Sequence, residues 1–550
     1  MNAGIYFHPD GYITEGRQIM GRHAAGESFL RGYLEGTRGQ EMWIQVEDPK
    51  HVPAFEKIAK RMGRNEAIRA VDVRGLGNLR TPGVVYYPGP TLAPEAYRRR
   101  VFGHRSWSLC GITHTTCSKR VMEAIAAYHT APVHPWDAVI CTSTAVHANV
   151  RCLLDEQEAF LRERLGSTRT ILPQLPVIPL GIHCDDFVFT ESQRQAARQR
   201  LGVKDDTLVV MFMGRLAFHA KAHPLAMYKA LEWSAKEAGV QVVLLECGWH
   251  GTDFIRNAYS QAAEAICPNV TVVHLDGRDT DQRNQAWAGA DVFCSLADNI
   301  QETFGITPIE AMAAGLPVVV SDWDGYRDTV RDGVDGFRIP TLMPPAGVGY
   351  DLANRHALEI DTYDMYCGFS SSFVAVDTER TAEALTRLFR SPDLRLGMGA
   401  AGRQRARSDF DWKVIIPRYL ELWDELHAIR TSSAELAPVA RRSAASLDPF
   451  QAFAGYATKT LTPTTQVILA QSDLGSSGQQ LEALMSLDMV SFAQPVLPKP
   501  PELLELLRQA AEGPRAAGDL LQAVPADRRP LMFRALAWLI KFDLLRVVDP

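Results

Sequence analysis

The sequence lacks a long apolar run, a regular cysteine pattern and an excess of positive charge. No apolar stretch approaches the roughly 18 residues that span a bilayer, and residues 1–10 lack a basic start followed by an apolar segment. We therefore expect a cytoplasmic protein. Nine cysteines are scattered and never spaced Cys-x-x-Cys, so neither a disulfide framework nor a zinc knuckle is indicated. Since 58 Lys and Arg stand against 64 Asp and Glu, we expect no nucleic-acid partner.

Short apolar runs alternate with amphipathic stretches through most of the chain. The most regular runs are residues 207–213, 240–246, 270–275, 290–296 and 317–322. Continuous apolar strands joined by helices predict a parallel sheet that is covered on both faces. A less regular series predicts a second sheet from residues 5–8, 42–46, 68–73, 84–87, 109–114, 139–142 and 177–180. Two such α/β domains in tandem create a cleft at the carboxyl ends of their strands.

The pattern changes after these domains. Residues 409–427 predict an amphipathic helix that is kinked or begins near Pro417, and residues 431–449 have the composition of a linker. Three short helices and a strand, expected at residues 502–512, 516–524, 529–542 and 544–548, predict a winged-helix-like appendage. Residues 500–550 carry seven basic and seven acidic residues, so we favour a dimerisation or interaction role over DNA binding.

The stretch from Asn299 to Asp322 is the most informative motif. Thr307 is the expected N-cap of a helix, with Pro308 at N1 and Glu310 at N3, and Gly315 is its expected end. Backbone N–H groups at the start of such a helix suit a diphosphate. The simpler interpretation is that Thr307 and Glu310 form only a capping box and that Glu302 is a solvated loop acid.

The segment Glu302-Thr-Phe-Gly-Ile-Thr-Pro-Ile-Glu310, followed by Ala-Met-Ala-Ala-Gly-Leu-Pro-Val, resembles the Glu-x7-Glu signature of the retaining glycosyltransferases of family 4. This resemblance implies a GT-B fold, in which two Rossmann-like α/β domains face a cleft, here with a small, mainly helical C-terminal domain added. We expect the parts to be residues 1–184 (acceptor side), 185–410 (donor side), 411–430 (a helix crossing back), 431–449 (linker) and 450–550 (appendage). Residues 340–373, rich in Pro, Gly, Tyr and Ser, predict a loop at the cleft edge.

Other stretches extend the resemblance. Residues 212–221 resemble the family's Gly-Arg-Leu…Lys-Gly element, with Arg215 and Lys221 matching the cations that neutralise the diphosphate and Ala222 replacing the usual glycine. The alternative is a pair of surface cations near a strand end. His114 matches the strand-end histidine that faces the donor sugar, although an isolated histidine there is more often structural. The family's Gly-Gly loop is absent, and Gly21 is the residue we assign to that place.

The resemblance implies transfer of a sugar from a nucleoside-diphosphate sugar to a hydroxyl acceptor, with retention and without a metal or other cofactor. It implies that His114 and Glu302 act on the sugar and that Glu310 holds the ribose. The implied donor-binding set is Gly21, Arg215, Lys221, Phe304, Gly305, Ile306, Thr307 and Glu310. A UDP-sugar is favoured over GDP-mannose. The acceptor is left open between a glycan, a lipid-linked sugar and a small metabolite, and a lipid-linked one implies peripheral contact with the inner face of the membrane.

Three alternatives stay open. A GT-B phosphorylase would transfer sugar to inorganic phosphate with a pyridoxal group, and a GT-B epimerase would convert a nucleotide sugar without an acceptor. A non-catalytic scaffold would use residues 450–550, the expected homodimer contact, to recruit partners. Four polar residues kept at donor-binding positions argue against the scaffold.

Overall fold

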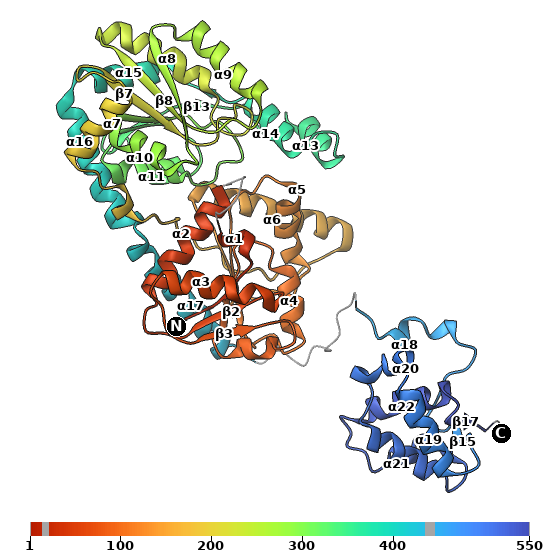
Figure 1. Cartoon of the computed structure of the whole chain (residues 1–550). Helices are drawn as coiled ribbons and strands as arrows, with labels where there is room; N and C mark the ends of the chain where they lie inside the picture. Colours follow the sequence, from red (N-terminus) through yellow and green to blue (C-terminus); the bar gives the residue numbers. More distant parts are fainter. Residues whose placement is uncertain (1, 14–20, 435–445, 549–550) are drawn as a thin grey trace. The chain divides into compact units, whose positions relative to one another are not determined.

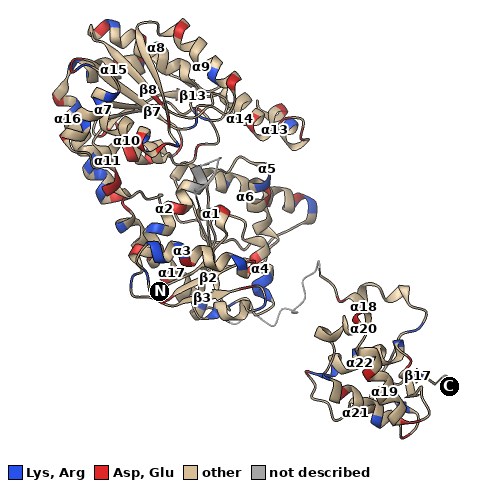
Figure 2. Cartoon of the chain, in the orientation of Figure 1, with Lys and Arg blue, Asp and Glu red and all other residues tan. Residues whose placement is uncertain are grey.

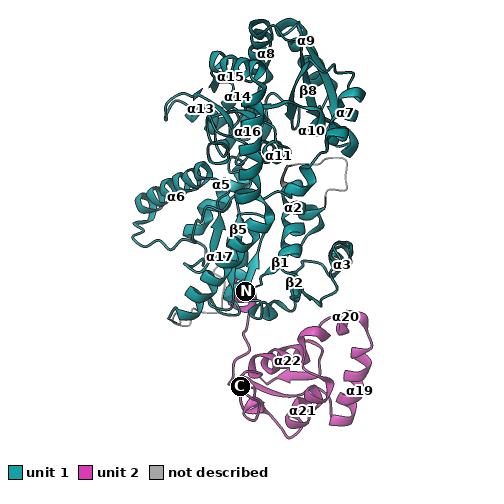
Figure 3. Cartoon of the chain, turned by 90° about the vertical axis from the view of Figure 1, so that its left-hand side faces the viewer, with its two compact units in different colours: residues 1–441 teal, residues 442–550 magenta. Residues whose placement is uncertain are grey.

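The computed structural model describes residues 2–13, 21–434 and 446–548, without the side chains of residues 21–23. The chain divides into two compact units, residues 1–441 and 442–550 (Figure 3). No helix among the described residues is both long enough and apolar enough to cross a membrane.

The first lobe of the larger unit is built on a six-stranded parallel sheet in the order β3-β2-β1-β4-β5-β6. Figure 1 shows this lobe around β2 and β3. Its strands are β1 (Gly4–Tyr6), β2 (Met42–Gln45), β3 (Ile68–Val71), β4 (Val84–Tyr86), β5 (Ser108–Ile112) and β6 (Ala138–Ile140). Its helices are α1 (Pro9–Tyr12), α2 (Gly21–Gly36), α3 (Val52–Arg61), α4 (Ala93–Arg100), α5 (Lys119–Ala126) and α6 (Thr144–Leu165). The expected strand at residues 177–180 is wrong, because Val177 makes only an isolated bridge to Cys141 beyond the edge strand β6.

The second lobe has a parallel sheet of the same size in the order β12-β11-β10-β7-β8-β9. Its strands are β7 (Leu208–Met213), β8 (Val242–Gly248), β9 (Val270–Asp276), β10 (Val292–Ser295), β11 (Val318–Ser321) and β12 (Gly336–Ile339). Its helices are α7 (Glu191–Arg200), α8 (Pro224–Ala238), α9 (Asp253–Ile266), α10 (Thr280–Gly289), α11 (Ile306–Ala314), α12 (Tyr326–Thr329), α15 (Thr378–Arg390) and α16 (Pro392–Arg405). Along β7, Val209 and Met211 join one apolar core while Val210 and Phe212 join the other. Burial on both faces explains why these strands are apolar throughout.

The chain crosses between the lobes twice, and the two crossings are hydrogen-bonded to each other. The N–H of Ile182 donates to the carbonyl of Phe410 at 2.8 Å, and the N–H of Trp412 donates to the carbonyl of Ile182 at 3.0 Å. The second crossing leads into α17 (Trp412–Ser432), which packs against α2 of the first lobe (Figure 1). The helix expected at residues 409–427 is present, and of the two alternatives for Pro417 the helix start is wrong, since Pro417 lies inside the helix. Asp411 caps the helix, accepting from the N–H of Lys413.

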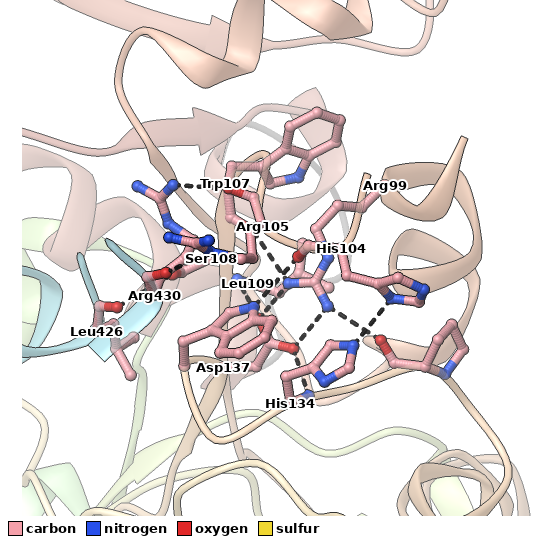
Figure 4. A network of polar contacts seen from close by, with 12 residues as sticks. Arg99, His104, Arg105, Trp107, Ser108, Leu109, His134, Asp137, Leu426 and Arg430 are labelled. Atoms are coloured by element: carbon pink, nitrogen blue, oxygen red, sulfur yellow. Dashed lines mark hydrogen bonds and ion pairs between the residues drawn. The ribbon is translucent and has the colours of Figure 1, made fainter. Parts of the chain in front are cut away.

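The end of α17 is anchored beside a buried ion pair (Figure 4). Arg430 donates from Nη1 to the carbonyl of Arg105 at 2.9 Å, and Arg105 donates from Nε to the carbonyl of Arg430 at 2.9 Å. Next to them, Nη2 of Arg99 donates to Oδ2 of Asp137 at 2.8 Å, and both side chains are fully buried. These contacts fix the returning helix to the lobe opposite the one it leaves.

Residues 340–373, expected as a loop, contain regular structure. They include β13 (Thr341–Leu342), α13 (Tyr350–Ala357) and α14 (Tyr363–Ser371), and β13 pairs with β14 (Ala375–Val376) in antiparallel fashion. The abundance of Pro, Gly and Ser suggested irregular chain, but α14 begins at a capped start, where Thr362 accepts from the N–H of Met365. We call residues 341–376 the bridging segment.

The smaller unit has its own apolar core and a three-stranded antiparallel sheet in the order β16-β15-β17. Its elements are α18 (Pro449–Ala452), β15 (Gln466–Leu469), α19 (Leu474–Met485), α20 (Asp488–Ser491), α21 (Pro500–Ala510), β16 (Arg515–Ala516), α22 (Arg529–Lys541) and β17 (Leu545–Val547). The helix expected at residues 516–524 is wrong, since β16 and a single 3-10 turn occupy that place. Basic and acidic residues are interspersed on this unit (Figure 2).

Candidate active site

The loops that carry the candidate residues meet where the strand order of the second sheet reverses. Strands β8 and β9 lie on one side of β7, whereas β10, β11 and β12 lie on the other. The crevice at such a reversal, at the carboxyl ends of the strands, is where open α/β sheets bind ligands. Arg215 and Lys221 follow β7, and Glu302 follows β10, so the predicted cations and the predicted acid lie on the two neighbouring loops at this point.

Lys221 and Glu302 form an ion pair, with Nζ and Oε2 3.3 Å apart. Burial of the Glu302 carboxyl, whose side chain is 17% exposed, favours the neutral acid. The charge and hydrogen bond of Lys221, together with the backbone N–H groups of Thr303 and Phe304, outweigh burial and hold the pKa of Glu302 below its ordinary value. Glu302 is therefore a carboxylate at neutral pH, able to accept hydrogen bonds from the hydroxyl groups of a ligand.

Arg215 reaches the same loop through Gln301. Its Nη2 donates to Oε1 of Gln301 at 3.3 Å, and Nε2 of Gln301 donates in turn to the hydroxyl of Tyr363 in the bridging segment at 2.9 Å. The loop itself is held by Asn299, whose side chain accepts from the N–H of Gln301 and donates to the carbonyl of His219. The two loops at the reversal are thus tied to each other and to the bridging segment.

Helix α11 begins earlier than the sequence predicts. Gly305 takes the N-cap place with φ of 76°, and no side chain caps the helix, so the expected capping box of Thr307 and Glu310 is wrong. The reason is packing: a Cβ on Gly305 would lie 1.9 Å from Cε1 of Tyr326, which leaves room only for glycine. The predicted end at Gly315 is confirmed. The first N–H groups of α11 have no side-chain acceptor at the cap, and Phe304, whose ring is buried, can offer only its backbone.

Two further acids in this region have raised pKa values. Burial raises the pKa of Glu310 to about 7, and Arg283 lowers it only in part. Burial, followed by the nearby charge of Glu302, raises the pKa of Asp324 to about 8. Asp324 also has a φ of 45°, a left-handed conformation that is uncommon outside glycine and that occurs at ligand sites. Asp324 was not predicted from the sequence, although the Asp324-Gly325 pair, which begins three residues after the end of the buried strand β11, was the available signal.

The first lobe contributes a third group of contacts. His114 lies two residues beyond the end of β5, and its neighbour Thr115 places Oγ1 3.1 Å from the hydroxyl of Tyr363, the same hydroxyl that Gln301 contacts. At the start of α6, Ser143 donates to the carbonyl of Thr303 at 2.8 Å. Ser143 therefore contacts the loop that follows β10 directly, whereas Thr115 reaches that loop through Tyr363.

Gly21 is the first residue of α2, and residues 14–20, which precede it, lie outside the described residues. Its role stays a prediction.

Comparison with known proteins found a family model that matches the second lobe. Residues 193–342 match the model of the family described as glycosyl transferases group 1. This segment is similar to the members of that family. It contains β7 to β12 and therefore every loop of the second lobe described above.

Two relatives and one solved structure extend the comparison. A D-inositol 3-phosphate glycosyltransferase of Geodermatophilus obscurus is 30% identical over 253 residues, which are 42% of this chain and 49% of the relative. A phosphatidyl-myo-inositol mannosyltransferase of Mycobacterium leprae is 33% identical over 293 residues, 53% of this chain and 61% of the relative. This chain thus covers less than two thirds of either relative. HepE of Anabaena, solved in complex with UDP, superposes with a TM-score of 0.51 at 16% identity, covering 77% of this chain and all of HepE. The likeness to HepE concerns the fold, and the two Rossmann-like lobes facing a cleft are those of GT-B proteins.

Proposed function

We propose that the chain is a retaining glycosyltransferase that moves a sugar from a nucleoside-diphosphate sugar to a hydroxyl acceptor. The observation that carries this proposal is the pairing of Lys221 with Glu302 at the strand reversal of a domain similar to the group 1 glycosyl transferases. A cation and a carboxylate side by side suit the two ends of one donor. The cation suits the diphosphate, which becomes more negative as it leaves, and the carboxylate suits the sugar, whose hydroxyls need acceptors.

The leaving diphosphate would be stabilised by Lys221, Arg215 and the uncapped N–H groups of Gly305, Ile306 and Thr307. These donors are fixed before the reaction, because the contacts of Arg215 with Gln301 and of Lys221 with Glu302 hold both cations in place. We propose that this charge makes added metal unnecessary. Retention would follow from attack by the acceptor on the face that the diphosphate leaves, with a diphosphate oxygen taking the acceptor's proton.

Glu302 would hold the sugar hydroxyls, and His114 would contact the sugar from the first lobe. Glu310 would hold the nucleotide ribose. The structure removes the rival explanation of Glu310 as a helix-capping residue, since the helix is capped at Gly305 without a side chain. Burial raises the pKa of Glu310 to about 7, and a buried acid with a perturbed pKa near the candidate site supports a role in ligand binding.

The first experiment tests a panel of nucleotide sugars without added metal. For each sugar nucleotide, the thermal stabilisation of the protein and the release of nucleoside diphosphate are measured. We place UDP-sugars first and GDP-mannose second. One nucleotide should raise the melting temperature and give slow diphosphate release, with water as a poor acceptor. The Glu302→Ala variant should lose release, whereas Glu264→Ala, an exposed acid on α9, should keep it.

No stabilisation by any donor would contradict the proposal and favour a non-catalytic scaffold. Conversion of the sugar without diphosphate release would indicate an epimerase. Transfer only to inorganic phosphate, together with the absorbance of a pyridoxal group, would indicate a phosphorylase.

A further inference from the structure

The bridging segment joins the two lobes at a second place, distant in sequence from the chain crossings. It leaves the second sheet after β12 and returns at α15, and its helices α13 and α14 lie on the side of the second lobe nearest α5 (Figure 1). Lys119 at the start of α5 forms an ion pair with Glu359 at 2.8 Å and also donates to the carbonyl of Ala357. The segment therefore touches the loop of residues 113–118 that carries His114.

Two cysteines meet at this contact, one from each lobe. The sulfur of Cys117 lies 3.8 Å from the sulfur of Cys367 in α14, and 3.4 Å from the hydroxyl of Tyr363. Thr115 places its hydroxyl 3.2 Å from the Cys117 sulfur. A disulfide has an S–S bond of about 2.05 Å, so the two sulfurs need to approach by less than about 2 Å to form one.

The environment makes Cys117 the nucleophile of the pair. It lies just before α5, where the positive end of a helix favours a thiolate, and Lys119 adds a cation two residues on. The hydrogen bond from Cys367, followed by those from Thr115 and Tyr363, lowers the pKa of Cys117 against the effect of burial. The same contact with Cys117, together with burial, raises the pKa of Cys367. Other buried cysteines differ: burial raises the pKa of Cys110, Cys141, Cys184, Cys247, Cys267 and Cys294.

We propose that Cys117 and Cys367 are a reversible thiol-disulfide site that cross-links the two lobes on reaction with a low-molecular-weight disulfide such as oxidised glutathione. The Cys117 thiolate attacks one sulfur of the oxidant, forming a mixed disulfide and releasing one thiolate. Cys367 then loses its proton to solvent and attacks the Cys117 sulfur, forming the protein disulfide and releasing the second thiolate. Two protein thiols are oxidised, and one oxidant disulfide is reduced to two thiols.

The consequence for turnover rests on the proposed function. The cross-link holds the loop of His114 against Tyr363, which contacts Gln301 and through it Arg215. With the lobes joined at this point as well as at the chain crossings, opening of the cleft for donor entry and diphosphate exit is restricted. Oxidation should therefore slow multiple-turnover diphosphate release, and reduction should restore it.

The test treats the reduced full-length protein with oxidised glutathione, blocks free thiols with an alkylating agent, and maps disulfides in the digest by mass spectrometry. The expected result is a peptide pair joining Cys117 to Cys367, a loss of two of the nine free thiols and no glutathione retained at these positions. Dithiothreitol should reverse all three changes. In Cys367→Ser, Cys117 should instead retain glutathione, and in Cys117→Ser the cross-link should be absent while Cys367 stays unmodified.

The matched control is Cys152→Ser, which removes the exposed cysteine of α6 and should leave the cross-link unchanged. Modification of Cys152 alone in the wild type would overturn the proposal.

A melting curve for each variant shows whether it is folded, and the wild-type mapping does not depend on any variant. Mass spectrometry detects the cross-link, and diphosphate release measures turnover. The proposed cross-link and the proposed function can therefore be contradicted independently of each other. Unchanged release from fully cross-linked protein would overturn the effect on turnover, while absence of release from reduced protein would contradict the proposed function.

Discussion

At the residue scale, the candidate site depends on how single charges are paired in a half-buried crevice. Lys221 compensates Glu302, so removing either one leaves the other without its partner. Asp324, beside Glu302, keeps its proton at neutral pH because burial and the charge of Glu302 raise its pKa to about 8. The site thus holds a carboxylate in Glu302, a neutral acid in Asp324 and an acid that titrates near neutral pH in Glu310. These differences in charge lead to specific predictions.

Lys221→Ala should reduce the rate of diphosphate release by roughly 10²- to 10³-fold, because a fixed cation at the leaving group is lost. Lys229→Ala, which removes an exposed lysine from α8, is the matched control and should leave the rate unchanged. The measurement is initial-rate release with the donor identified by the panel. Equal rates for the two variants would argue that Lys221 only balances Glu302.

We expect donor binding to depend on pH through the ionisation of Glu310. Because its pKa is raised to about 7, it becomes a carboxylate, the better acceptor for ribose hydroxyls, as pH rises through 7. Donor affinity should therefore increase by up to about tenfold between pH 6 and 8, in step with the ionised fraction. Glu310→Gln should flatten this dependence in calorimetric titrations. A glutamine variant that binds the donor as tightly as the wild type at pH 8 would remove the ribose role.

The Glu310 carboxyl should also make the stability of the folded protein depend on pH. Rising pH should lower this stability, whereas it should increase donor affinity. The folded pKa of this carboxyl, about 7, lies above the ordinary value of 4.5, so the unfolded state loses this proton at lower pH than the folded state. Without donor, the free energy of unfolding of the wild type should therefore fall relative to that of Glu310→Gln as pH rises from 4.5 to 7. Urea unfolding of both proteins across this range measures it.

At the element scale, the start of α11 is set by one glycine against one aromatic ring. Gly305 has a positive φ, and a Cβ there would meet the Tyr326 ring, whose hydroxyl lies 3.0 Å from that of Ser295 in β10. The glycine thus fixes both the helix start and its distance from the sheet.

Gly305→Ala should destabilise the protein and weaken donor binding. Gly166→Ala is the matched control, since Gly166 ends α6 with φ of 66° and has no atom within 4 Å of an added Cβ. The control should cost about 1 kcal/mol for the backbone conformation alone. Gly305→Ala should cost at least about 1 kcal/mol more, because the Tyr326 ring must move. Urea unfolding gives both values, and equal costs would contradict the packing explanation.

At the scale of the whole molecule, the chain has two units with separate cores. The core of the smaller unit extends from Val467 to Leu545 and contains no residue of the larger unit. In the larger unit, by contrast, one core continues from the first lobe through α17 into the second. The lobes should therefore unfold together and the smaller unit by itself.

Calorimetry of the full chain should show two thermal transitions. A donor nucleotide should raise the temperature of only one of them, since the candidate donor residues belong to the larger unit. The isolated segment of residues 446–550 should reproduce the other. A single transition, shifted as a whole by the nucleotide, would contradict independent cores.

Local sequence alone determined every strand of the two six-stranded sheets except β12. Uninterrupted apolar runs predicted β7 to β11 because parallel strands covered on both faces need apolar side chains throughout. The resemblance in residues 302–310 singled out Glu302, and in the structure this carboxylate pairs with Lys221. The roles of both residues stay predictions.

Only the tertiary structure decided the features that depend on distant segments. The start of α11 moved from Thr307 to Gly305 because Tyr326, in another element, packs over the glycine. The order of strands, and thus the meeting of two loops at one crevice, follows from how helices pack on both faces of the sheet. The approach of Cys117 to Cys367 joins positions 250 residues apart, and no local pattern encodes it. Sequence specifies each segment's preferences, whereas packing between segments selects which side chains meet.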